Sequence, residues 1–141
     1  MKNVSLAISI VLVCVTLVKL SGAQGPSDGS PAPKHESPFA CNRAALTPEA
    51  RTRHFDELGP ALRAKHKSIR EVTDGFEFEF PSDPATVQLV AEWAAGEHLC
   101  CPFFDIDLRM AREGGSLWLR LTGREGVKQF VRADFARWFQ K

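Results

Sequence analysis

Two adjacent cysteines, Cys100 and Cys101, are the residues of this 141-residue chain best suited to chemistry. They belong to residues 97–104, which are Glu-His-Leu-Cys-Cys-Pro-Phe-Phe. Neighbouring Cα atoms lie about 3.8 Å apart, whereas an unstrained disulfide needs about 4.4 to 6.8 Å between its Cα atoms. The two thiols therefore do not readily bond to each other. Each is available to a soft metal ion, a third cysteine or a redox partner.

Cys41 adds a third thiol, far away in the sequence. The fourth cysteine, Cys14, lies in an apolar N-terminal stretch that we interpret as a signal peptide, so we expect three cysteines after its removal. An odd number leaves at least one thiol without an intramolecular partner. Three interpretations stay open. Cys41 bonds one of the vicinal pair in an oxidising compartment, or the thiols are redox-active, or three thiolates bind a soft ion such as Hg²⁺, Cu⁺, Cd²⁺ or Zn²⁺.

Two further side chains are candidate ligands beside the vicinal cysteines. Helical periodicity places Glu97 on the same apolar stripe as Trp93, and an inward-facing carboxylate is costly unless it is paired or coordinated. Glu97 is therefore a candidate metal ligand, although a pair with Arg43 or Arg120 would also satisfy it. His98 lies at the edge of the stripe and is a possible additional ligand, although a histidine at such a position is more often a surface residue.

The helix dipole helps to separate these interpretations. Reactive thiolates typically lie at helix N-termini, whereas Cys100 and Cys101 end a predicted helix, where the partial charge is negative and attracts a cation. The sequence also contains no C-x-x-C, G-x-S-x-G, Gly-rich phosphate loop or H-E-x-x-H motif. These features favour metal binding over catalysis and leave an enzyme uncertain. The alternatives are an extracytoplasmic thiol oxidoreductase or thiol-dependent lyase, and a disulfide-stabilised domain.

Local signals indicate the elements that carry these residues. Thr47-Pro48 and Asp83-Pro84 each combine an N-cap with a proline in the first helical turn, so each is expected to begin a helix. The first helix should run to about residue 64, with a kink or break at Gly59-Pro60. The second helix should end before Pro102.

Alternating apolar residues predict two β-hairpins. The first covers residues 69–80 around an Asp74-Gly75 turn, and the second covers residues 104–121 around Gly114-Gly115. A third helix carries an apolar face from Val127 to the end of the chain. The resulting order, α-ββ-α-ββ-α, predicts an α+β fold with three helices and a four-stranded antiparallel sheet built from two hairpins.

The chain is expected to divide into three parts. Residues 1–23 are a predicted signal peptide, residues 24–40 a disordered tether rich in proline and serine, and residues 41–141 a single α+β domain. The mature protein is thus expected to be exported, periplasmic or secreted, and to meet a membrane only if the N-terminal segment is uncleaved. The formal net charge is +1, and −1 without Lys2 and Lys19, which argues against nucleic acid as a partner.

The motif resembles that of a group of small uncharacterised bacterial proteins, and more loosely the C-terminal extensions of some MerR-type heavy-metal regulators. The matching features are Cys41 with Leu46, the E-x-x-C-C-P-F-F motif of residues 97–104, the Leu-Trp-Leu-Arg-Leu-Thr-Gly segment of residues 117–123, Val127 and Phe130. The resemblance covers most of residues 41–141 and implies a thiol site at Cys41, Cys100 and Cys101. Unlike those regulators, this chain has a predicted signal peptide and no helix-turn-helix domain.

Overall fold

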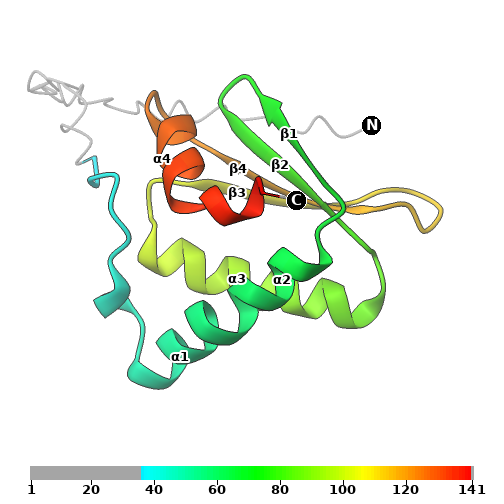
Figure 1. The fold of residues 1–141 in the computed structure, drawn as a ribbon, viewed down its shortest axis with the longest axis horizontal. Coiled ribbons are helices and arrows are strands. Elements are labelled where there is room, and N and C mark those ends of the chain that lie inside the picture. The colour runs from blue at the N-terminus through cyan, green and yellow to red at the C-terminus, as the bar shows by residue number, and fades with distance from the viewer. Residues whose placement is uncertain (1–35, 141) are drawn as a thin grey trace, which may run out of the picture. The chain divides into compact units, whose positions relative to one another are not determined.

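The structure is a computed structural model that describes residues 36–140 (Figure 1). The predicted signal peptide, residues 1–23, and the predicted tether up to residue 35 lie outside the described residues. Within residues 36–140, none of the helices has both the length and the apolar composition needed to cross a membrane.

The sheet is four-stranded and antiparallel throughout, with strand order β1-β2-β4-β3. Its strands are β1 (Ser68–Val72), β2 (Gly75–Phe80), β3 (Asp105–Met110) and β4 (Leu117–Thr122). Each hairpin joins strands that are consecutive in sequence, and β2 and β4 pair in the middle. The predicted α+β class with two hairpins is confirmed.

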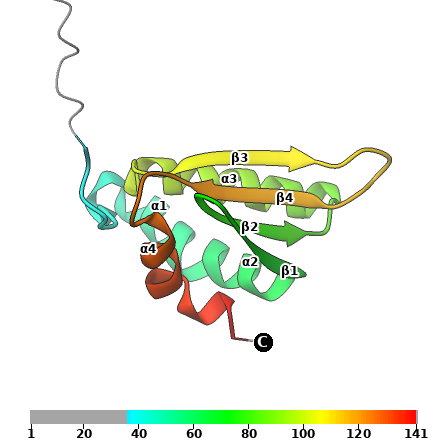
Figure 2. The same ribbon diagram turned by 90° about the horizontal axis from the view of Figure 1, so that it is seen from above.

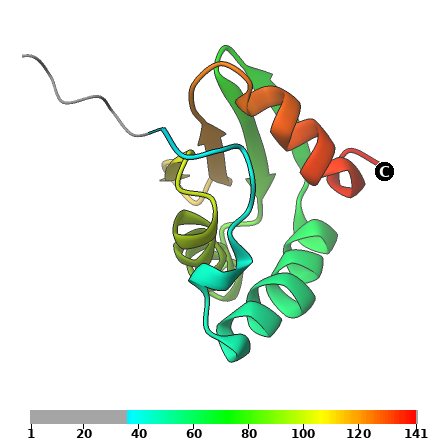
Figure 3. The ribbon, with the colours of Figure 1, turned by 90° about the vertical axis from the view of Figure 1, so that its left-hand side faces the viewer.

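Three helical stretches pack against this sheet. They are α1 (Pro48–Thr52), which continues through the π-helical segment η2 (Arg53–Leu58) into α2 (Gly59–Lys65), then α3 (Pro84–Cys100), and α4 (Val127–Asp134) followed by the 3₁₀ turn η3 (Ala136–Trp138). A further 3₁₀ turn, η1 (Arg43–Ala45), precedes α1. In Figure 2, α1, α2 and α3 lie behind the strands. Figure 3 shows α4 beside the hairpin of β1 and β2, and α4 contacts β2.

The core lies between the sheet and the helices. Three cross-strand pairs of β2 and β4 are buried: Phe76 with Leu121, Phe78 with Leu119, and Phe80 with Leu117. These six residues alternate along the two strands, so their side chains share one face of the sheet. Trp138 of η3 packs edge-on against Phe78, with ring centroids 5.4 Å apart. The two central strands therefore form the surface against which α3 and the C-terminal helix pack.

The first helical stretch differs from the expected kink or break at Gly59-Pro60. Thr47 caps it as predicted, because its hydroxyl oxygen accepts a hydrogen bond from the Ala50 N–H at 3.2 Å. Before the proline the helix widens, and the Gly59 N–H donates to the His54 carbonyl, five residues back. Pro60 has no N–H and would crowd the preceding turn of an α-helix. The π-helical segment accommodates it without ending the helix.

The first hairpin turns one residue earlier than expected. Val72 pairs with Gly75, so Thr73 and Asp74 form the loop and Gly75 is the first residue of β2. The sequence predicts Gly75 as a turn residue, but the structure requires a glycine there for a steric reason. A Cβ at this position would lie 2.0 Å from the Leu121 carbonyl oxygen of β4.

The last residues of the predicted tether pack onto the domain. Phe39 lies edge-on against Phe103, with centroids 5.2 Å apart, and the Arg124 guanidinium lies 4.0 Å from the centre of its ring. Arg124 also donates a hydrogen bond to the Ser37 carbonyl. This segment leads directly into Cys41.

Candidate metal centre

The end of α3 places the two vicinal thiols side by side. Cys100 is the last residue of the helix, and the Cys101 N–H still donates to the Glu97 carbonyl at 2.7 Å. Cys101 itself leaves the helical conformation, with φ −125° and ψ 66°, because the residue before Pro102 is pushed out of the α region. The two sulfur atoms lie 3.9 Å apart, and both side chains are buried.

A backbone hydrogen bond brings Cys41 to the same place. The Asn42 N–H donates to the Cys100 carbonyl at 2.7 Å and so satisfies one of the carbonyls that a helix leaves unpaired at its C-terminus. The sulfur atoms of Cys41, Cys100 and Cys101 all lie within 4.8 Å of one another, and the three thiols are free. The predicted convergence of the three cysteines is therefore present in the fold.

The sulfur geometry suits a thiolate-bound ion. Metal–sulfur bonds of about 2.3 Å in a tetrahedral site place two sulfurs about 3.8 Å apart, close to the 3.9 Å between Cys100 and Cys101. Cys41 is partly exposed, whereas the other two thiols are fully buried. An ion would therefore reach the buried pair from the side of Cys41.

Glu97 points inward as predicted, but its partner is a histidine rather than an arginine. The carboxylate is 3% exposed, and its Oε2 lies 3.0 Å from His54 Nε2 and 3.8 Å from Cys100 Sγ. The two arginines proposed from the sequence are engaged elsewhere: Arg120 pairs with Asp74, and Arg43 lies over the ring of Phe55.

His54 is the site residue that the sequence did not reveal. It lies in η2, 43 positions before Glu97, and is 3% exposed. Its ring stacks on Trp93, with centroids 5.5 Å apart. The one local signal is Gly96, an unfavourable residue inside a helix. A Cβ at Gly96 would lie 2.5 Å from His54 Nδ1, so the glycine makes room for the ring.

The charges of this cluster depend on the contacts that Cys100 makes with Cys101 and His54. The Cys101 thiol, and then His54, lower the pKa of Cys100 to about 4 by hydrogen bonding, against the opposing effect of burial. Burial lowers the pKa of His54, but hydrogen bonds to Cys100 and Glu97 outweigh it and raise the pKa to about 9. Near neutral pH, Cys100 is therefore a thiolate beside an imidazolium. The hydrogen bonds from Cys101 and His54 outweigh the unfavourable dipole expected at this helix end.

The other acidic groups of the cluster hold their protons more tightly. Burial raises the pKa of Glu97 and raises that of Cys41 to about 12. The hydrogen bond to Cys100, followed by burial, also raises the pKa of Cys101. Binding a cation to these thiols must therefore release protons, as metal binding to cysteine does in general.

His98 does not join the cluster. Its side chain is exposed on α3, and the two groups of donors that could hold a metal within residues 36–140 do not include it. These groups are Cys41 with Cys100 and Cys101, and His54 with Glu97 and Cys100.

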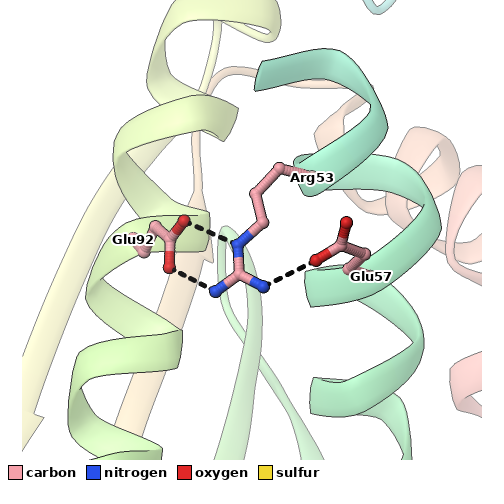
Figure 4. A network of polar contacts seen from close by, with 3 residues as sticks. All are labelled: Arg53, Glu57 and Glu92. Carbon is pink, nitrogen blue, oxygen red and sulfur yellow. Dashed lines mark hydrogen bonds and ion pairs between the residues drawn. The ribbon is translucent and has the colours of Figure 1, made fainter. Parts of the chain in front are cut away.

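An ion-pair network fixes the helix that carries His54 against α3 (Figure 4). Arg53, the residue before His54, donates two hydrogen bonds to the carboxylate of Glu92, both of 2.9 Å. It also pairs with Glu57 at 2.7 Å, one turn further along its own helix. The bidentate contact joins η2 to α3 five residues before Glu97.

The donor atoms define what this site can do chemically. Three thiols, one imidazole and one carboxyl group converge from α3, η2 and the segment before η1. Such donors suit a soft or borderline cation. Comparisons of the chain with protein-family models, curated proteins and solved structures found no match, so the functional conclusion depends on this geometry.

Proposed function

We propose that this is an exported protein that binds one soft metal ion through the thiolates of Cys41, Cys100 and Cys101. The observation that carries the proposal is the convergence of three free sulfur atoms within 4.8 Å. Soft thiolate ligands select ions such as Hg²⁺ and Cu⁺, and also suit Cd²⁺ and Zn²⁺. The preformed sulfur geometry and the partly exposed Cys41 support binding without a large rearrangement.

Glu97 supports this binding as a weak ligand or as a group that positions its neighbours. Its carboxyl oxygen lies 3.8 Å from Cys100 Sγ and is held by His54. Groups of this kind typically change metal affinity about 10- to 100-fold, which is less than the loss of a thiolate ligand. Replacing Glu97 by Gln should therefore weaken binding less than replacing any of the three cysteines.

One observation also supports a second candidate, an extracytoplasmic thiol oxidoreductase. Contact with the Cys101 thiol and with His54 lowers the pKa of Cys100, as in reactive cysteines. However, reactive cysteines are at least partly exposed, whereas Cys100 and Cys101 are both fully buried. The burial favours metal binding as the main proposal.

Serine substitutions test the proposal. Hydroxyl oxygen is a poor ligand for soft ions, so Cys41→Ser, Cys100→Ser and Cys101→Ser should each weaken Hg²⁺ or Cu⁺ binding by orders of magnitude, measured by competition with a chelator of known affinity. His98→Gln is the matched control, because His98 is exposed on the same helix. Equal affinity in the wild type and in the Cys100→Ser, Cys101→Ser double variant would rule out the proposed function.

A further inference from the structure

We propose that His54, Glu97 and Cys100 form a second cation site, adjacent to the three-thiolate site and sharing the sulfur of Cys100 with it. The occupant would be a borderline divalent ion of the zinc class. The inference rests on the proposed function only through Cys100, which would then bridge two ions.

The three donor atoms are already in place. The ligand atoms of His54, Glu97 and Cys100 all lie within 4.8 Å of one another. For a tetrahedral zinc ion, standard bond lengths imply about 3.4 Å between nitrogen and oxygen, and about 3.6 Å between sulfur and oxygen. The corresponding distances are 3.0 Å between His54 Nε2 and Glu97 Oε2, and 3.8 Å between Cys100 Sγ and Glu97 Oε2. The first distance would have to lengthen by about 0.4 Å and the second to shorten by about 0.2 Å to match these values.

The donor types differ between the two sites. Three sulfurs select a soft ion, whereas one nitrogen, one oxygen and one sulfur are the mixed set that zinc-class ions accept. The three side chains of the second set are all buried, and they come from two elements, η2 and α3. The bidentate contact of Arg53 with Glu92 holds these two elements together.

Charge balance allows a second ion. When Cys41, Cys100 and Cys101 bind as thiolates, they and the Glu97 carboxylate carry four negative charges. One divalent ion and the His54 imidazolium together offset three of these charges. A second divalent ion that replaces the His54 proton brings the net charge to zero, so binding at the second site releases that proton.

The second ion would keep one coordination position open. Three protein ligands leave the fourth tetrahedral position to water or another small ligand. His54 and Glu97 also line a cavity of about 340 Å³, and its aromatic walls are Phe55, Trp93, Phe135 and Trp138. This cavity offers the second ion a route of entry that is separate from Cys41.

Sequential loading tests the second site. Protein that carries one equivalent of Hg²⁺ is titrated with Co²⁺, whose visible absorption is intense when the ion is tetrahedral. The wild type should bind one further equivalent. His54→Gln and Glu97→Gln should each weaken Co²⁺ binding at least about tenfold, and His98→Gln should match the wild type. Near-UV circular dichroism checks folding, and if one of the two variants fails to fold, the other decides.

The outcomes separate this inference from the proposed function. If the wild type binds Hg²⁺ but no Co²⁺, or if both folded variants bind Co²⁺ as well as the wild type does, the second site is overturned and the three-thiolate site stands. If the wild type binds no Hg²⁺, the proposed function fails. Cys41→Ser then tests the second site alone, because Cys41 is not one of its ligands. Retained Co²⁺ absorption in that variant supports the second site, and its absence overturns it.

Discussion

Cys100 belongs to both groups of donors, one with Cys41 and Cys101 and the other with His54 and Glu97. Its burial alone would keep the thiol protonated, but the Cys101 thiol and the His54 imidazolium lower its pKa. The metal-free protein therefore holds a thiolate that is ready for a cation. The same contact raises the pKa of His54, so the two groups stabilise each other's charged forms.

This contact predicts a distinct pH dependence of stability in the metal-free protein. Cys100 has a lowered pKa, so its contribution is present above the unfolded value of 9.0 and is lost as the pH falls towards about 4. The pKa of His54 is raised, so its contribution is present below 6.5 and is lost as the pH rises through about 9. The two effects oppose each other between pH 6.5 and 9. Of these two groups, only Cys100 changes the stability below pH 6.5, and the raised pKa of Glu97 acts there in the opposite sense, because a group with a raised pKa stabilises the fold more as the pH falls.

We therefore expect Cys100 and His54 together to change the free energy of unfolding little between pH 6.5 and 9. The contribution of Cys100 should decrease from pH 6.5 towards 4, where unfolding takes up about one proton at Cys100. Urea unfolding of the wild type and of Cys100→Ala across this range measures the effect. An identical pH dependence in the two proteins would contradict the assignment of Cys100 as the thiolate.

At the scale of elements, the π-helical segment η2 determines where His54 points, and the Arg53 network holds that segment to α3. We expect Arg53→Gln to weaken binding of the second ion, by at most about fivefold because exposed ion pairs contribute little. Glu92→Gln should have a similar effect, since it removes the same bridge. Glu57→Gln is the matched control, because Glu57 contacts Arg53 within one helical stretch. Equal losses in the Glu57 and Glu92 variants would contradict this role.

The elements themselves were largely predictable because their signals are local. Thr47 and Asp83 cap helices as their types and following prolines indicate, and each hydroxyl or carboxylate accepts the expected backbone hydrogen bond. The alternation of phenylalanine and glutamate predicted β2. The conversion to a π-helical segment at Gly59-Pro60 was not predictable, because proline indicates an interruption without specifying its form.

The site was predictable where its residues share a helix or are chemically distinctive. Cys100, Cys101 and Glu97 lie within five residues, so their common position follows from helical periodicity. Cys41 could be included because cysteine is chemically distinctive. His54 could not be found, since its contact with Glu97 spans 43 positions and depends on the packing of η2 on α3.

At the scale of the whole molecule, the paired central strands carry much of the buried core. We expect Phe78→Ala to lower the free energy of unfolding by about 3 to 5 kcal/mol, as for a buried phenylalanine. Phe78 is fully buried between β4 and Trp138. Leu108→Ala on the edge strand β3 is the control and should cost much less, because Leu108 is 43% exposed. Urea unfolding measures both, and equal costs would contradict the assigned core.

The fold places Cys41, which is distant in the sequence, beside the end of α3. The binding proposal depends on this proximity of the three cysteines. X-ray absorption at the mercury edge, on protein loaded with one equivalent of Hg²⁺, counts the sulfur atoms bound to the ion. Three sulfur neighbours are predicted for the wild type, and two for Cys41→Ser. Two or fewer sulfur neighbours in the wild type would contradict a site formed by Cys41, Cys100 and Cys101 together.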